Sequence, residues 1–226
     1  MTEETFTDNG SRALVIEGLI GVGKTTLCQK IAERAIATGA FDRVIVKPEP
    51  ISPFMLDAYL ENKKHYAPIF QHNILFKLLN IYRETEQELK KNRRLLVIID
   101  RGLIGNLSFA EMQHKTKLFD DVDYKLYREE FNVDDGFEKK WAQHKQFVTI
   151  YLRCDPKVAF ERMKKRGNPG EIKSYTPEYF KNLHEMHDKN LGGGNVPWIP
   201  WDNVQMDCNG DLENDAVDRI LGNYLT

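Results

Sequence analysis

Hydrophobic and polar positions follow two rhythms along the chain: short apolar runs, and longer segments whose apolar residues recur every three or four positions. The short runs predict five strands, the last supported mainly by its place in the series, at residues 13–17, 43–48, 95–100, 147–153 and 204–207. The longer segments predict helices at residues 24–38, 53–61, 66–92, 105–113, 121–143, 156–165, 176–191 and 211–224. Strands that alternate with helices indicate an α/β fold, a three-layer sandwich in which helices cover both faces of a five-stranded parallel sheet.

Residues 18–25, between the first strand and the first helix, fit the phosphate-binding pattern G-x-x-x-x-G-K-[ST]. In such a loop, backbone N–H groups and the positive end of the following helix face the phosphates of a nucleotide. The lysine reaches the β- and γ-phosphates, and the threonine hydroxyl can bind Mg²⁺. A chance match rarely has both the strand before it and the amphipathic helix after it. We therefore expect a nucleoside triphosphate site at Gly18, Gly21, Val22, Gly23, Lys24, Thr25 and Thr26.

Composition narrows the class of protein. The 226 residues carry a net charge of −2, which gives no general attraction to nucleic acid or to an anionic membrane. No apolar stretch approaches the length of a membrane span, and the three cysteines indicate a reduced intracellular setting. Residues 1–11 are polar and lack the apolar core of a signal peptide. We expect a flexible tail at 1–11, a single domain at 12–226 and a cytoplasmic location, with a nuclear one left open.

Charged residues close the third predicted strand, at Asp100 and Arg101. Ligands of open α/β sheets bind beyond the carboxyl ends of the strands, so both side chains are candidates for the site. A carboxylate at this point, downstream of a phosphate loop, typically assists Mg²⁺. The guanidinium can stabilise a transferring phosphoryl group or hold the acceptor oxygen. The alternative is that the two residues only cap the next helix.

Glu49 follows the second predicted strand and lies between Pro48 and Pro50. Prolines on both sides restrict the backbone, which holds this carboxylate in one direction. A carboxylate held at the edge of a nucleotide site can accept a hydroxyl proton as the oxygen attacks the γ-phosphate. The alternative is an ordinary solvated glutamate.

The order and spacing of these motifs resemble the deoxynucleoside kinase family, which includes deoxycytidine kinase, the insect multisubstrate kinase and the mitochondrial and herpesvirus thymidine kinases. The matching motifs extend from about residue 12 to about 208, at residues 16–26, 49–50, 70–71, 100–101, 151–153, 160–162 and 179–187. The resemblance implies transfer of the γ-phosphoryl group of ATP, with Mg²⁺, to the 5′-hydroxyl of a deoxynucleoside. It also implies a homodimer, Glu49 as catalytic base and Arg101 at the 5′-hydroxyl.

The same resemblance implies how the nucleoside is held. Gln71 matches the glutamine that makes a pair of hydrogen bonds with the nucleobase, since an amide donates and accepts at once. Phe54 matches an aromatic residue near the base, and Phe109 matches a ring that stacks on it. Tyr59 and Glu171 match the pair that contacts the 3′-hydroxyl of the sugar.

A basic helix end at residues 162–166 leads into residues 167–171. The resemblance implies a lid that closes over the triphosphate, with Arg162 and Arg166 on the phosphates. A basic run is otherwise most often a solvated helix face. Its place directly after the fourth predicted strand favours the lid.

The sequence departs from the family pattern near the base and after Arg101. Gly102 stands where the family has serine, and the helix reaches Phe109 one residue early. Deoxycytidine kinase has an arginine and an aspartate near the exocyclic group of the base, whereas Leu78 and Asn106 match those positions here. The absence of that charged pair favours a pyrimidine, thymidine in particular.

His184 and His187 invite a metal hypothesis because Glu185 lies between them. H-E-x-H is not the zinc spacing H-E-x-x-H, so we favour an ordinary position on a helix for both histidines.

Two other functions compete with a deoxynucleoside kinase. Thymidylate kinase also has Glu-Pro after its second strand and Asp-Arg after its third, but Gln71, Tyr59 and Glu171 are better explained by a nucleoside. A non-catalytic regulator would bind ATP without turnover, and it would not need a base such as Glu49.

Overall fold

The apolar runs form the parallel sheet that the sequence predicts. A computed structural model describes residues 9–132, 146–192, 203–208 and 214–224. The strands lie in the order β2-β3-β1-β4-β5, with β1 in the middle. Their bounds are β1 (Arg12–Gly18), β2 (Arg43–Lys47), β3 (Leu95–Asp100), β4 (Phe147–Arg153) and β5 (Asn203–Asp207).

Nearly every residue of β1, β3 and β4 is buried, because helices cover both faces of these central strands. Val15 of β1 lies beside Ile99 of β3 and Thr149 of β4 in parallel register. Parallel register brings the carboxyl ends of all three strands to one edge of the sheet. That edge is where the phosphate loop begins, immediately after β1.

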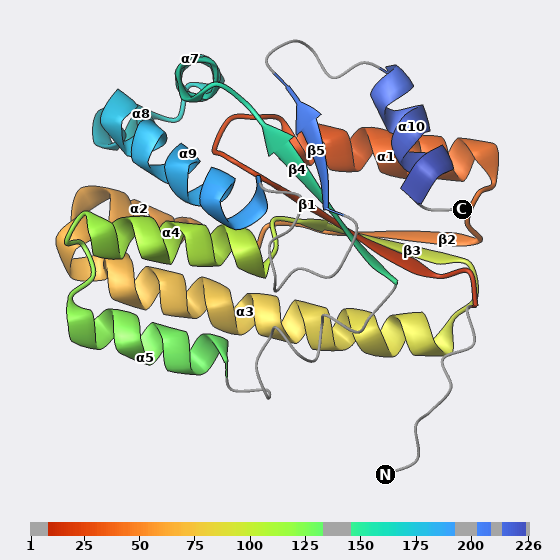
Figure 1. The fold of residues 1–226 in the computed structure, drawn as a ribbon, viewed down its shortest axis with the longest axis horizontal. Coiled ribbons are helices and arrows are strands. Elements are labelled where there is room, and N and C mark those ends of the chain that lie inside the picture. The colour runs from red at the N-terminus through yellow and green to blue at the C-terminus, as the bar shows by residue number, and fades with distance from the viewer. Residues whose placement is uncertain (1–8, 133–145, 193–202, 209–213, 225–226) are drawn as a thin grey trace.

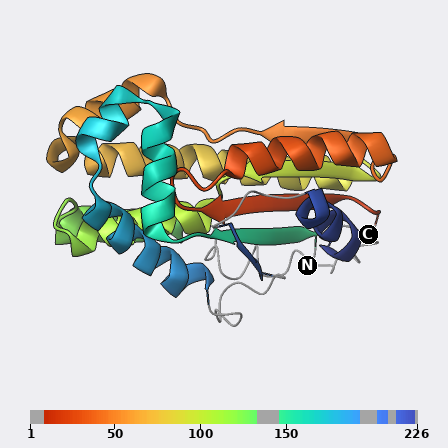
Figure 2. The ribbon, with the colours of Figure 1, turned by 90° about the horizontal axis from the view of Figure 1, so that it is seen from above.

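The helices form two layers and a cluster beyond the strand ends. Helices α1 and α10 pack together on one face, α3 and α4 contact the other, and α5 packs against α3 and α4 (Figures 1 and 2). Helices α2, α7 and α8 lie beyond the carboxyl ends of the strands (Figure 1). The predicted three-layer sandwich is confirmed. The helices are α1 (Lys24–Thr38), α2 (Pro53–Glu61), α3 (Lys63–Lys91), α4 (Leu103–Lys115), α5 (Asp121–Phe131), α7 (Pro156–Arg166), α8 (Pro169–Ser174), α9 (Pro177–Leu191) and α10 (Asn214–Tyr224).

Helix boundaries differ from the predicted ones where side chains cap the first turn. Helix α3 begins at Lys63, three residues early, because the side chain of Asn62 accepts the N–H of His65. Helix α8 was not predicted; the Asn168 side chain caps it by accepting the N–H groups of Gly170 and Glu171. In the described part of the chain, no helix is both long enough and apolar enough to cross a bilayer.

The described part of the predicted tail is attached to the domain. The Asn9 amide donates to the carbonyls of Leu89 and Asn92 at the end of α3, and Ser11 is fully buried. Residues 1–8, the helix predicted to continue from 133 to 143 and the first residues of the helix predicted at 211–224 lie outside the described residues.

Candidate active site

A cavity of about 750 Å³ lies at the carboxyl edge of the sheet, where the phosphate loop, the end of β3 and residues 162–171 meet. Most of the residues that the sequence predicts for the site line it: Gly21, Gly23, Lys24, Thr25, Thr26, Glu49, Gln71, Arg101, Phe109, Arg162, Arg166 and Glu171. The structure therefore brings together residues spread over 151 positions of the chain, from Gly21 to Glu171.

Lys24 is buried at the start of α1, and its Nζ donates to the carbonyl of Leu19 at 2.9 Å. Burial and the positive charge of Arg101 lower the pKa of Lys24 to about 8. Val22 is buried beneath the loop, and the Gly18 carbonyl accepts a hydrogen bond from Arg101 at 3.3 Å. Gly18 and Val22 thus belong to the phosphate loop but do not line the cavity.

Thr25 and Asp100 form a pair beside the loop. The Thr25 hydroxyl donates to Oδ2 of Asp100 at 2.5 Å, and Asp100 is almost wholly buried. The other carboxylate oxygen, Oδ1, is buried with no hydrogen-bond partner among the described residues. A buried carboxylate oxygen without a donor is costly unless a cation or a ligand satisfies it.

Arg101 joins the loop to the second strand end. Its backbone is left-handed, with φ 70°, a conformation that costs energy in a residue with a side chain. Its Nε donates to Oε1 of Glu49, and its guanidinium lies 4.8 Å from the centre of the Phe109 ring. Burial alone would raise the pKa of Glu49, but Arg101 and Lys24 outweigh burial and lower it. Glu49 is therefore ionised at neutral pH.

A chain of amides lies elsewhere in the cavity lining. Oε1 of Gln71 accepts a hydrogen bond from Nδ2 of Asn106 at 2.7 Å, and both residues are only 1% exposed. Glu171 is also buried, and its Oε2 accepts from Nη2 of Arg166 at 2.5 Å. Gln71 and Glu171 thus place polar groups at two parts of one cavity.

Comparison with known proteins identifies the family. The model of a family described as deoxynucleoside kinase matches residues 14–220, which is most of the chain. The chain belongs to the deoxynucleoside kinase family. It is 28% identical over 201 residues to a deoxyguanosine kinase of Dictyostelium discoideum, and 30% identical over 178 residues to a deoxyadenosine kinase of the same organism. These matches cover 87% and 79% of this chain, but only 66% of each relative's length.

The fold agrees with a solved structure of the same family. A deoxyadenosine kinase from M. mycoides, solved with bound dCTP, superposes with a TM-score of 0.68 at 21% identity. The match covers 93% of this chain and 97% of that one. At this identity the likeness shows the fold, the P-loop arrangement of a deoxynucleoside kinase.

Two residues expected from the family resemblance do not reach the cavity. Phe54 is 76% exposed, because the face of α2 that lines the cavity carries Pro53, Leu56 and Asp57 instead. Tyr59 is buried against α3, and its hydroxyl is hydrogen-bonded to Tyr179 and Gln113. Both positions depend on which face of α2 is turned toward the cavity. The spacing of residues in the sequence does not determine that rotation. The fully buried Leu78 does not line the cavity either.

Glu17, for which the sequence suggested no role, is fully buried under the cavity at the end of β1. Its Oε1 accepts the N–H of Gly105 at 2.8 Å in the first turn of α4. A Cβ at Gly102 would lie 2.9 Å from that oxygen, and one at Gly105 would overlap the carboxylate. At Gly102 the Tyr82 hydroxyl and Cγ1 of Val15 are closer still, each 2.5 Å from such a Cβ, so this position has no room for a side chain. The only sequence signal was a carboxylate inside an apolar strand.

Residues 162–171, for which the sequence predicts a lid, lie at the end of α7 and the start of α8. Arg162 donates from Nη1 to the carbonyl of Cys208 at 2.6 Å, and Arg166 holds Glu171. Asn168, which lies within the predicted lid, and Tyr175, which no sequence motif pointed to, also line the cavity.

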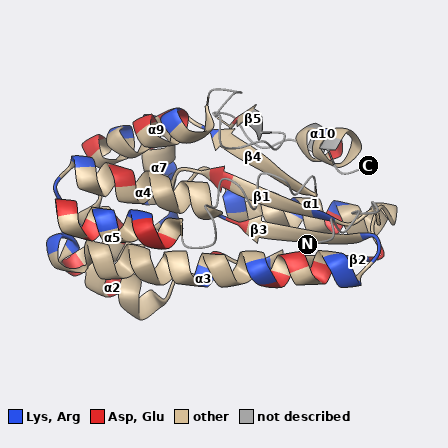
Figure 3. Cartoon of the chain, turned by 60° about the horizontal axis from the view of Figure 1, so that its bottom comes forward, with Lys and Arg blue, Asp and Glu red and all other residues tan. Residues whose placement is uncertain are grey.

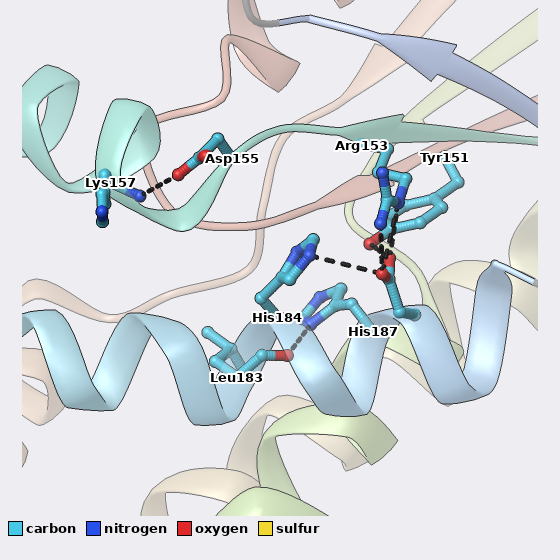
Figure 4. Close-up of polar contacts among 8 residues, drawn as sticks. Tyr151, Arg153, Asp155, Lys157, Leu183, His184 and His187 are labelled. Atoms are coloured by element: carbon cyan, nitrogen blue, oxygen red, sulfur yellow. Dashed lines mark hydrogen bonds and ion pairs between the residues drawn. The ribbon is translucent and has the colours of Figure 1, made fainter.

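The two histidines of α9 are not among the residues that line the cavity, and Figure 4 shows their polar contacts. His184 contacts Asp188, with Nε2 3.3 Å from Oδ2, and Nδ1 of His187 lies 3.0 Å from the Leu183 carbonyl. His187 is fully buried, which lowers its pKa to about 3. Helix α9 presents His187 to the core, where its ring meets Tyr151 and Phe109.

Proposed function

We propose that the protein is an ATP-dependent deoxynucleoside kinase that transfers the γ-phosphoryl group to the 5′-hydroxyl of a deoxynucleoside. The observation that supports this most is the ionised Glu49, held by Arg101 in the same cavity as Lys24. A nucleotide-binding module would not need a carboxylate there. The activity fits a cytoplasmic enzyme of nucleotide salvage.

Glu49 takes the proton of the 5′-hydroxyl while the 5′-oxygen of the nucleoside forms a bond to the γ-phosphorus. The bond between the γ-phosphorus and the bridging oxygen breaks, and ADP leaves with its electron pair. Arg101 orients the hydroxyl and holds Glu49. Lys24, Arg162 and Arg166 neutralise the charge of the transferring phosphoryl group, the main contribution that a protein makes to this reaction. Glu171, with Arg166, holds the 3′-hydroxyl. Phe54 and Tyr59 have no part in the proposal.

The residues at the phosphate loop fit Mg²⁺. The Thr25 hydroxyl and the unpaired Oδ1 of Asp100 are hard oxygen ligands, which this ion prefers. Among the described residues no group of three or more His, Cys, Asp or Glu side chains forms a metal site. Two protein oxygens suit an ion that keeps several waters and binds nucleotide phosphates. Bound Mg²⁺ would neutralise charge on the β- and γ-phosphates.

The proposal favours a pyrimidine, thymidine in particular, as the base. Its support is that the cavity lining holds Gln71 and Asn106 as a neutral, hydrogen-bonded amide pair. Phe109, which also lines the cavity, would stack on the base. The purine names of the two Dictyostelium relatives give the opposite indication, so the base has to be measured.

Thymidine and thymidylate, compared as acceptors in a coupled ADP assay, test the proposed function. We expect thymidine to be phosphorylated and thymidylate to be a poor acceptor, because Glu49 already occupies the guanidinium of Arg101 that a second phosphate would need. Turnover of thymidylate alone would instead indicate a thymidylate kinase. ATP binding without turnover on any deoxynucleoside would indicate a regulator.

The pKa of Lys24 predicts how ATP binding depends on pH. Without ATP, the Lys24 side chain is charged below pH about 8 and becomes neutral above it. The affinity for ATP should therefore fall as pH rises from 7 to 9.5. Well above the pKa, the charged fraction falls about tenfold per pH unit. Calorimetric titration of ATP at several pH values measures this. Lys24→Arg, which stays protonated, should flatten the dependence. A wild-type affinity that does not change over this range would contradict the assignment.

A homodimer completes the proposal. Ile69 and Phe76 of α3, and Val122 and Leu126 of α5, are each at least half exposed, and α3 packs against α5. Figure 3 shows that the charged residues of α3 are concentrated toward β2, while the half toward α2 carries few. Burying such an apolar surface favours association. A monomer in sedimentation equilibrium at micromolar concentration would contradict the dimer.

A further inference from the structure

Three side chains from three helices form one hydrogen-bond chain that ends at the cavity. The hydroxyl of Tyr127 on α5 donates to Oδ1 of Asn106 on α4 at 2.5 Å. Nδ2 of Asn106 donates to Oε1 of Gln71 on α3 at 2.7 Å. Asn106 and Gln71 line the cavity, whereas Tyr127 is fully buried behind them.

Tyr127 sets the direction of this chain. Among the described residues its hydroxyl has one hydrogen-bond partner, Asn106, and its ring packs against Phe119 and Phe131. If the Asn106 amide were turned over, Nδ2 would face the phenol oxygen and the phenol proton would have no acceptor. Burial raises the pKa of Tyr127 well above 10, so the phenol remains a donor. The hydrogen bonds therefore run from Tyr127 to Asn106 to Gln71.

Because the hydrogen bonds run in this direction, the amides of Gln71 and Asn106, which form one wall of the cavity, offer a ligand more donors than acceptors. Oδ1 of Asn106 and Oε1 of Gln71 are each already engaged by a donor. Both hydrogens of Nε2 on Gln71 and the second hydrogen of Nδ2 on Asn106 remain for a ligand, against one lone pair on each oxygen. A ligand edge that offers more acceptors than donors satisfies such a wall.

Nucleobases differ in this respect at one position. Thymine, uracil, guanine and hypoxanthine present an exocyclic carbonyl beside a ring N–H, which gives two acceptor lone pairs and one donor. Cytosine and adenine present an exocyclic amino group beside a bare ring nitrogen, which gives two donors and one acceptor. Against the three N–H donors of Gln71 and Asn106, a carbonyl edge with its two lone pairs leaves one donor unpaired, whereas an amino edge with its single acceptor leaves two. Ring size does not enter this comparison.

We infer that the enzyme prefers deoxynucleosides whose base carries a carbonyl at this position over those that carry an amino group, an inference that rests on the kinase function proposed above. Asn106 contacts the base and sets the preference. Tyr127 is a positioning residue that acts through Asn106. The exocyclic group thus separates thymidine from deoxycytidine among the pyrimidines, and it acts on purine bases in the same way.

Two pairs of substrates isolate the exocyclic position: deoxyuridine with deoxycytidine, and deoxyinosine with deoxyadenosine. We expect kcat/KM of the wild-type enzyme to favour the carbonyl member of each pair by about tenfold to a hundredfold, the usual effect of leaving a buried donor unpaired. A ratio at or below one in both pairs would overturn the inference.

Variants then test which residues carry the ratio. Asn106→Asp replaces the donor by an acceptor and should shift both ratios toward the amino member by at least about tenfold. Tyr127→Phe removes the fixed donor, so the Asn106 amide can turn over and the ratios should approach one. Tyr124→Phe is the matched control on α5, because the Tyr124 ring stacks on His114 and, among the described residues, its hydroxyl makes no hydrogen bond with Tyr127, Asn106 or Gln71.

The outcomes separate this inference from the proposed function. A purely structural role of Tyr127 would lower all four kcat/KM values in parallel and leave the ratios unchanged, and unchanged ratios in Asn106→Asp would overturn the role of Asn106. If no deoxynucleoside is phosphorylated, the proposed function fails. Calorimetric binding of deoxyuridine and deoxycytidine then decides the inference alone: tighter binding of deoxyuridine supports it, and equal affinities or no binding overturn it.

Discussion

Glu49→Gln should lower kcat by about two to four orders of magnitude while leaving nucleoside binding largely intact. The amide keeps the size of the side chain and can still contact Arg101, but it cannot take the proton of the 5′-hydroxyl. Single-turnover rates with saturating ATP measure the chemical step directly, and calorimetry measures binding. The loss should therefore appear in kcat and leave the dissociation constant almost unchanged.

Glu61→Gln is the matched control, since Glu61 is exposed at the end of α2 and does not line the cavity. The pH dependence gives a second check. Because Arg101 and Lys24 lower the pKa of Glu49, wild-type activity should persist at neutral pH and be lost only as pH falls through that lowered pKa. An unchanged kcat in Glu49→Gln would remove Glu49 from the mechanism.

Arg101→Met should reduce kcat/KM by about a thousandfold or more. The substitution removes the guanidinium that orients the 5′-hydroxyl and, with it, the positive charge that holds Glu49. Without that cation the pKa of Glu49 rises, so the acidic limb of the pH–rate profile should move to higher pH. Breaking a buried ion pair from one side also costs about 3–5 kcal/mol of folding free energy. Urea unfolding at pH 7 measures that loss.

Arg101→Lys separates charge from geometry. A lysine retains the positive charge, so the acidic limb should stay near its wild-type position. It lacks the fork that contacts Glu49 and the Gly18 carbonyl together, so kcat/KM should still fall. If the acidic limb of Arg101→Met coincides with that of the wild type, Arg101 does not control the pKa of Glu49.

The sheet and the phosphate loop were predictable because local sequence determines them. The central strands are mostly apolar runs; Asp100 ends one of them, and Lys24 follows another after the phosphate loop. Parallel register brings consecutive strand ends together, so the partners of Lys24 could be inferred without coordinates. The strand order, with β1 between β3 and β4, depends on long-range packing that no local pattern encodes.

Predictions that depended on helix phase were less successful. Phe54 lies only one residue from Pro53, yet that step of about 100° turns it away from the cavity. Tyr59 was expected at the sugar, but Tyr179 and Gln113 hold its hydroxyl from helices distant in sequence. Helix α8 is too short to show apolar periodicity, and its cap at Asn168 was the available signal.

The close packing around Gly102 and Gly105 determines where this enzyme can be redesigned. A Cβ at Gly105 would overlap the buried carboxylate of Glu17, and one at Gly102 would lie 2.5 Å from the Tyr82 hydroxyl and from Cγ1 of Val15. A combinatorial library aimed at new nucleoside drugs should therefore keep both glycines fixed. Diversity belongs instead at the apolar lining, where Leu56 and Ile74 can change volume without displacing a charge.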